Sequence, residues 1–198
     1  LLDLVAHSGD RSLLPYLEEK SLDPETLKFI RSAAAEVYVN IASVEECIEF
    51  MRKAVQLARK HDIVLCHDCA YSELTYDGYV APSILQVEGA KDIAAEFHSL
   101  SKTFCMTGWR VGFFVGNRQI VEGLAKVKTN VDSGLFQAIQ HAGIAAMNEC
   151  DEESAEICEV FSERRDIIVK GLTDIGYDVS SPKASFYLWT PVPHGLKS

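Results

Sequence analysis

The chain has 198 residues and a net charge of −10, from 19 Lys and Arg against 29 Asp and Glu. Apolar residues make up 47% and charged residues 24%, which is ordinary usage for a globular domain and argues against disorder. A nucleic-acid-binding surface needs clustered Lys and Arg, so the acidic balance argues against one. No apolar run approaches a membrane span, and the N-terminus carries no signal-peptide core. We therefore expect a soluble, cytoplasmic protein with no membrane or nucleic-acid partner.

The first segments to show structure are a short helix that opens at Asp23 and a strand at residues 35–39. Ser43 and Glu46 have the spacing of a capping box, and the apolar residues that follow predict an amphipathic helix over 44–60. Residues 63–66 are continuously apolar, which is typical of a buried parallel strand. Strand, helix and strand in this order indicate a βαβ unit, and hence an α/β sheet with a right-handed crossover.

The rest of the chain continues this alternation. The expected elements are strands at 92–98, 111–115 and 186–189, a polar loop at 99–108, and helices at 118–128, 135–147 and 152–175, the last stopped by Gly176. A change in composition near residues 148–153 is the one candidate domain boundary.

The six cysteines do not indicate a disulfide scaffold or a metal site. Cys66 and Cys69 form a CxxC pair, but side chains three apart on a strand point to opposite faces. No second CxxC is present to complete a zinc site. We expect structural or incidental thiols and no bound metal.

Polar side chains gather where the predicted strands end. Parallel strands present their carboxyl ends at one edge of a sheet, which is where open α/β sheets bind ligands. The link from Lys102 to Val111 is too short for a crossover, so the next strand must run antiparallel or leave the sheet. An antiparallel strand brings Arg110 to the same edge. The residues expected on this rim are Asp68, Tyr71, Ser99, Ser101, Lys102 and Arg110. Their charges and hydroxyls suit a cofactor.

The rim residues belong to two recognisable motifs. Residues 98–112, HSLSKTFCMTGWRVG, resemble the lysine signature of fold-type I, pyridoxal-phosphate-dependent aminotransferases, and residues 68–71 resemble the D-x-A-Y motif of that family. The flanking residues 71–73, 77–78 and 130–137 are most similar to its LL-diaminopimelate and aspartate/alanine-type branch. The resemblance extends over about residues 27–189.

The resemblance implies a three-layer αβα fold with a mostly parallel sheet. Residues 1–150 would be part of the large cofactor-binding domain. Residues 151–198 would be the linking helix and the start of a small α+β domain. The implied activity, in amino-acid metabolism, is transfer of an amino group between an amino acid and a 2-oxo acid, catalysed by a homodimer with pyridoxal 5′-phosphate.

The resemblance also implies a role for each rim residue. Lys102 would form a Schiff base with the cofactor and move the substrate proton during turnover. Asp68 would keep the pyridine nitrogen protonated, and Tyr71 would hydrogen-bond the phenolic oxygen.

The cofactor phosphate would be held by the remaining rim residues. Arg110 offers a planar fork of donors, and Ser99 and Ser101 add hydroxyls. The neighbouring His67 and His98 are expected to be core or supporting residues without a chemical role.

The sequence departs from the family pattern after Asn40, where the N-P-T-G turn is absent. The phosphate loop that precedes it in the family and the arginine for the substrate carboxylate are not matched either. A truncated gene product and an omitted segment both explain this. Two alternatives to transamination therefore stay open: a lyase or racemase reaction with the same cofactor, and a non-catalytic fragment or partner subunit.

Overall fold

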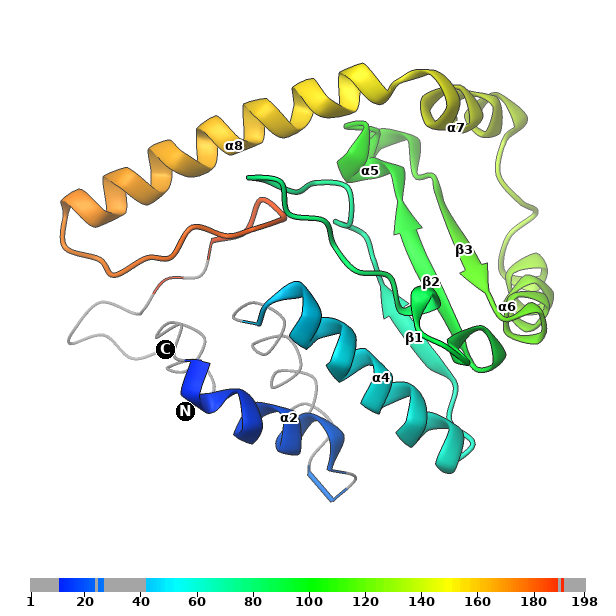
Figure 1. Cartoon of the computed structure of the whole chain (residues 1–198). Helices are drawn as coiled ribbons and strands as arrows, with labels where there is room; N and C mark the ends of the chain where they lie inside the picture. The colour runs from blue at the N-terminus through cyan, green and yellow to red at the C-terminus, as the bar shows by residue number, and fades with distance from the viewer. Residues whose placement is uncertain (1–10, 24, 27–41, 189, 191–198) are drawn as a thin grey trace.

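The computed structural model describes residues 11–23, 25–26, 42–188 and 190 (Figure 1). The strands are β1 (Leu65–Asp68), β2 (Ala94–Ser99) and β3 (Gly112–Gly116). The α-helices are α2 (Leu14–Leu22), α4 (Val44–Lys60), α5 (Leu100–Thr103), α6 (Arg118–Val131), α7 (Gln137–Glu149) and α8 (Asp151–Asp174). Single 3₁₀ turns are η1 (Arg11–Leu13), η2 (Ile84–Gln86), η3 (Ala90–Asp92) and η4 (Thr107–Trp109).

The three strands form one mixed sheet in the order β1-β2-β3. β1 pairs with β2 in parallel, with Asp68 opposite Phe97. β2 pairs with β3 antiparallel, with Ser99 opposite Gly112. The parallel β1–β2 pair agrees with the sequence-based expectation, and β3 takes the antiparallel one of the two outcomes that the short link left open. Helices pack around the sheet as expected for an α/β protein. Figure 1 shows α4 alongside β1 and α6 beside β3.

Helix α4 begins at the predicted capping box. The Ser43 side chain accepts from the Glu46 N–H at 3.2 Å, and the Glu46 carboxylate accepts from the Ser43 N–H at 2.7 Å. These bonds satisfy two backbone donors that a helix start leaves without partners. The buried face of α4 then packs into a core that includes Met51, Val55, Ile84, Val87, Ala90 and Ala94. This core fixes the β1–β2 edge of the sheet.

The first strand is displaced from its predicted position. The Ile63 N–H bonds to the Ala58 carbonyl, so Ile63 closes the end of α4, and sheet pairing starts only where Leu65 N–H reaches the Ile93 carbonyl. Ile63 and Val64 are 52% and 57% exposed. The expectation of a buried strand at 63–66 is therefore wrong in its start, because Ile63 and Val64 come before the pairing begins, and in its burial, because Leu65 is only half-buried and Cys66 is exposed.

The C-terminal part of the described chain is a long helix, α8, followed by residues 177–188, which we call the returning segment. α6, α7 and α8 agree with the predicted helices to within about three residues. Gly176, at φ 91°, ends α8: its N–H bonds to the Thr173 carbonyl, and the Tyr177 N–H bonds to the Leu172 carbonyl. Figure 1 shows the chain then turning back beneath α8 toward the loop that follows β1.

The strand predicted at 186–189 is not formed over its described residues, 186–188. One isolated bridge pairs Ala184 with Thr75, and the backbone then turns at Ser185, whose φ of 69° is left-handed. A left-handed residue breaks the extended geometry that a strand requires, so the pairing stops after one bridge.

Several predicted features of the N-terminal part fall outside the described residues: the strand at 35–39, Asn40, and most of the short helix opened by Asp23. Asp23 itself ends α2, and its carboxylate accepts from the Glu25 N–H at 3.0 Å and the Thr26 hydroxyl at 2.7 Å. α2 was not predicted from the sequence.

Candidate active site

Lys102 lies on α5, a single helical turn that follows β2 directly. Ser99 caps this turn, because its hydroxyl accepts from the Ser101 N–H at 3.2 Å. The expected loop at 99–108 is therefore wrong in part: the segment holds both α5 and η4. The Lys102 Nζ lies 5.7 Å from the centre of the Tyr71 ring and 5.9 Å from that of Phe186. The backbone thus delivers the Lys102 amine to an aromatic surface at the carboxyl end of the sheet.

Packing around α5 holds this turn in place. Leu100 and Met106 form a buried cluster with Ala146 of α7. Gly143 lies so close that an added Cβ would be 3.4 Å from both Leu100 and Val111 side-chain carbons. Ser101 is also buried, and its carbonyl accepts from the Thr107 hydroxyl at 3.1 Å. α7 therefore covers α5 from outside and leaves the Lys102 side facing Tyr71.

Asp68 and Tyr71 come from the end of β1. The ladder extends one residue beyond Asp68, where the Cys69 N–H bonds to the Phe97 carbonyl at 2.8 Å. The Tyr71 hydroxyl donates to the Tyr187 hydroxyl at 3.2 Å. Burial, then this hydrogen bond, and then the charge of Asp68 raise the pKa of Tyr71 to about 12. Tyr71 is therefore a neutral hydrogen-bond donor at physiological pH.

Arg110 reaches the same edge through the antiparallel pairing of β2 and β3. It lies two residues before Gly112, which pairs with Ser99, and its φ of 53° is left-handed. The guanidinium donates to the Thr107 carbonyl at 3.0 Å. A Cβ at position 112 would lie 2.4 Å from the His98 carbonyl, so the close approach of the strands requires glycine there. The strand register thus brings Arg110 and Ser99 to one rim.

The structure adds two aromatic residues that sequence reasoning missed, Phe186 and Tyr187. The Phe186 and Tyr187 rings contact Tyr71 edge-on, at centroid distances of 5.3 and 5.6 Å. They lie more than a hundred residues after Tyr71 in the chain, and the sequence placed both in a strand. No local pattern indicates this contact, because it depends on where the chain returns after α8.

A buried carboxylate supports the site from the sheet. Glu96 is 2% exposed and accepts from the Ser83 hydroxyl and the Ile84 N–H, both at 2.8 Å. His67 Nδ1 and His98 Nε2 lie 3.0 and 3.1 Å from its two oxygens. Burial raises the pKa of Glu96, but the hydrogen bonds from His67, Ser83 and His98 outweigh it, so the net pKa is lowered. His67 and His98 are thus half-buried partners of Glu96.

Cys66 and Cys69 do not act as a pair. Cys66 is exposed and Cys69 is buried, with the Cys69 sulfur 3.0 Å from His67 Nδ1. Burial, and next the charge of Glu96, raise the pKa of the Cys69 thiol to about 12. The ligand-type atoms of His67, Cys69 and Glu96 lie within 4.8 Å of one another. We assign this cluster to hydrogen bonding, because both Glu96 oxygens already accept from neighbouring donors.

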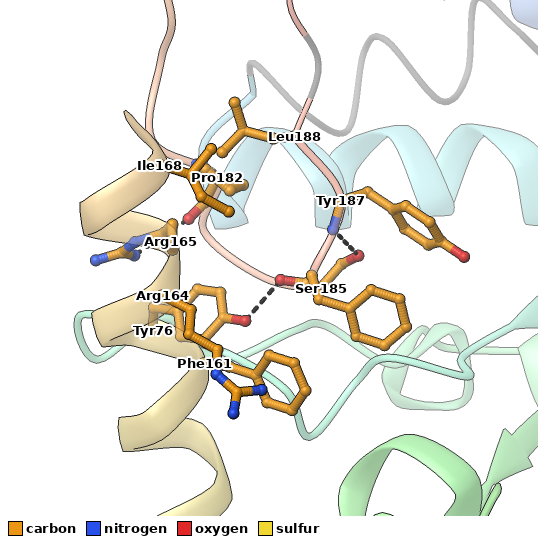
Figure 2. A pocket seen from close by; sticks show the side chains of 10 residues that line it. Tyr76, Phe161, Arg164, Arg165, Ile168, Pro182, Ser185, Tyr187 and Leu188 are labelled. Carbon is orange, nitrogen blue, oxygen red and sulfur yellow. Dashed lines mark hydrogen bonds between the residues drawn. The ribbon is translucent and has the colours of Figure 1, made fainter. Parts of the chain in front are cut away.

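A small cavity of about 150 Å³ lies between α8 and the returning segment (Figure 2). On one side the Tyr76 hydroxyl donates to the Ser185 carbonyl at 2.6 Å. Near it Arg165 of α8 is buried, pairs with Asp77 at 2.7 Å and lies over the Tyr76 ring at 4.8 Å. Phe186 lines this cavity and also contacts Tyr71. The cavity therefore borders the rim behind Phe186, and its polar groups fasten the returning segment.

None of the described helices combines the length and the apolar character that crossing a membrane would need.

Comparison with known proteins identifies the family. The sequence model for aminotransferase class I and II matches residues 48–196. LL-diaminopimelate aminotransferase 2 of Trichormus variabilis is 56% identical over 151 residues, which cover 76% of this chain and 39% of the relative. LL-diaminopimelate aminotransferase of Gloeobacter violaceus is 46% identical, over 96% of this chain and 50% of the relative.

Solved structures of similar fold support the same family. Apo-BacF from Bacillus subtilis has a TM-score of 0.71 at 34% identity, over 79% of this chain and 41% of that protein. An aminotransferase from Staphylococcus aureus has a TM-score of 0.70 at 36% identity, over 75% and 39%. The chain spans about half or less of the length of these relatives. By its sequence and its fold, the chain belongs to the class I and II aminotransferases, a pyridoxal-phosphate-dependent family.

Proposed function

We propose that this chain carries the cofactor-holding rim of an aminotransferase, with pyridoxal 5′-phosphate bound covalently to Lys102. The observation that carries the proposal is the placement of the Lys102 amine. A one-turn helix at the carboxyl end of β2 holds it beside Tyr71, on the edge of the sheet that also bears Asp68 and Arg110. The reaction is transfer of an amino group from an amino acid to a 2-oxo acid.

The residues present on this rim fit the cofactor chemically. Lys102 supplies a primary amine, which would hold the cofactor through its aldehyde group. Asp68 supplies a carboxylate for the protonated ring nitrogen, and Tyr71 supplies a neutral phenol whose pKa is raised to about 12, so it donates to the phenolic oxygen. Each functional group of the cofactor ring thus has a partner of the right chemistry at this edge.

The phosphate partners come from the start of α5 and the turn before β3. The guanidinium of Arg110 is exposed and offers a planar fork of donors, which suits a phosphate. Ser99 adds a hydroxyl at the start of α5. Ser101 is buried, so we expect it to contribute less of its side chain than Ser99.

When bound, the cofactor supplies an electron sink for the bond broken at the substrate α-carbon. The chain contributes the proton carrier and the surroundings. Lys102 Nζ, once free, accepts and returns the α-proton. The aromatic rings of Tyr71 and Phe186 flank this amine and limit the access of water.

The substrate, the domain division and the assembly are part of the same proposal. Two relatives at 46–56% identity are named LL-diaminopimelate aminotransferases, which supports that amino acid as the donor. We assign residues 1–150 to the large domain and 151–198 to the linking helix and the start of the small domain. Only Cys150 separates α7 from α8 at this boundary. We expect a homodimer, as the sequence resemblance implies, and a cytoplasmic location, as the composition implies.

The test compares Lys102→Ala with Lys126→Ala, a matched change on α6. The wild type and Lys126→Ala should show the visible absorbance of lysine-bound cofactor and should lose it when LL-diaminopimelate is added. That change should reverse with a 2-oxo acid. Lys102→Ala should show neither signal. If Lys102→Ala keeps the lysine-bound absorbance, the proposal is wrong. Turnover that needs no 2-oxo acid would instead indicate a lyase or racemase.

A further inference from the structure

The returning segment is fastened to the loop that follows Tyr71. The Ser185 N–H bonds to the Leu74 carbonyl at 2.8 Å, and the Tyr76 N–H bonds to the Lys183 carbonyl at 3.0 Å. The Tyr76 hydroxyl adds a bond to the Ser185 carbonyl at 2.6 Å. Backbone bonds of this kind fix position without regard to side-chain rotamers. These hydrogen bonds hold the residues that follow Ser185 at the rim.

Two further contacts orient the Tyr187 side chain within this segment. Its N–H bonds to the Ser185 hydroxyl at 3.2 Å, which closes a local turn (Figure 2). Its neighbour Phe186 packs between Tyr71 and Phe161 of α8, at centroid distances of 5.3 and 5.7 Å. The Tyr187 ring then meets Tyr71 edge-on, with the two hydroxyl oxygens 3.2 Å apart. The backbone bonds at Ser185, the local turn and the ring packing together fix the position of the Tyr187 hydroxyl against that of Tyr71.

We propose that Tyr187 is a positioning residue, whose hydroxyl hydrogen-bonds that of Tyr71 and so orients and strengthens Tyr71 as the donor to the cofactor. This inference rests on the proposed function. A tyrosine hydroxyl has one proton to donate and two lone pairs. In the structure Tyr71 donates to Tyr187, but hydroxyl protons rotate to suit their partners. With the cofactor bound the two hydroxyls would exchange roles, so that Tyr71 accepts from Tyr187 while it donates its own proton to the cofactor's phenolic oxygen. Linked hydrogen bonds polarise one another, so the outer bond strengthens the inner one.

The sign of the effect follows from the charges at the rim. The groups that face Tyr71 are the amine of Lys102 on α5, the carboxylate of Asp68 on β1 and the Tyr187 hydroxyl. Loss of the proton from the lysine–cofactor link leaves negative charge on the phenolic oxygen. Donation from Tyr71 stabilises that form and lowers the pH midpoint of the absorbance change. Removing the Tyr187 hydroxyl weakens the donation and raises the midpoint.

The experiment titrates the visible absorbance of cofactor-loaded protein against pH. Tyr187→Phe keeps the ring and its packing and should raise the midpoint by about 0.2–0.6 pH unit, the share expected of one cooperative bond. Tyr71→Phe should raise it further. Tyr177→Phe, a matched change beyond the end of α8, should leave the midpoint unchanged. Circular dichroism confirms that each variant is folded.

A double variant separates positioning from a general structural effect. In a Tyr71→Phe background, Tyr187→Phe should add no further shift, because Tyr187 acts through the Tyr71 hydroxyl. An equal shift in both backgrounds, or no shift from Tyr187→Phe alone while Tyr71→Phe responds, overturns the inference and leaves the proposed function standing. A wild type without the lysine-bound absorbance overturns both.

Discussion

Replacing Glu96, the buried carboxylate of β2, should destabilise the protein. Its buried carboxylate receives bonds from η2, through Ser83 and Ile84, and from His67 and His98 on the two parallel strands. Glu96→Ala removes the acceptor and leaves the donors. A buried donor without a partner costs about 1–3 kcal/mol.

The loss in the free energy of unfolding depends on which of these donors can hydrogen-bond to water once the carboxylate is removed. The Ile84 N–H is buried and Ser83 is half-buried, whereas the side chains of His67 and His98 are 27% and 19% exposed. We therefore count only the first two as losing their bonds fully, which gives a loss of about 2–6 kcal/mol in the free energy of unfolding. Glu96→Gln keeps the shape and one acceptor oxygen and should cost about 1–2 kcal/mol.

Guanidinium unfolding followed by far-ultraviolet circular dichroism measures both values, with Glu88→Ala on the exposed loop as the matched control. The control should stay within about 0.5 kcal/mol of the wild type. Because the folded state lowers the pKa of Glu96 below its ordinary 4.5, the stabilisation is present above pH 4.5 and is lost as the pH falls further. The gap between the wild type and Glu96→Gln should narrow accordingly. A Glu96→Ala variant as stable as Glu88→Ala would refute the reasoning.

Three further predictions concern the stability contributed by Arg165 and Ser43 and the reactivity of Cys69. Arg165→Ala should lower the free energy of unfolding by about 1.5–3 kcal/mol, because the buried guanidinium donates to the Pro182 carbonyl and packs on the Tyr76 ring, whereas its exposed partner Asp77 contributes little. Arg164→Ala next to it should change the free energy of unfolding by less than about 0.5 kcal/mol, and equal effects of the two changes would contradict this. Ser43→Ala should cost about 1 kcal/mol in thermal unfolding through loss of the helix cap, and an unchanged melting temperature would contradict it. In alkylation followed by mass spectrometry, Cys69, with its pKa raised to about 12, should react much more slowly than exposed Cys66.

Features set by neighbouring residues in the chain were predictable. The capping box of Ser43 and Glu46 starts α4, and Gly176 ends α8, because both act within one helical turn. The short link between Lys102 and the next strand left two outcomes, an antiparallel strand or one outside the sheet, and the structure has the antiparallel strand that returns Arg110 to the rim. A link of a few residues leaves only one or two possible directions for the strand that follows it.

Features that depend on distant partners were not predictable. Phe186 and Tyr187 look like strand residues, yet the left-handed Ser185 turns the chain so that both rings meet Tyr71. Likewise, the sequence around Glu96 shows a charge in an apolar strand, but not that donors from η2 and two strands converge on it. Side-chain convergence of this kind depends on the tertiary fold, which no local periodicity reports.

Chemical trapping of the cofactor shows which lysine holds it. Borohydride reduction of protein loaded with pyridoxal 5′-phosphate fixes the cofactor on the lysine that carries it, and peptide mass spectrometry locates the label. We expect the label on Lys102, within the peptide that follows β2. A label on any other lysine, or no label on protein that binds the cofactor, would contradict it.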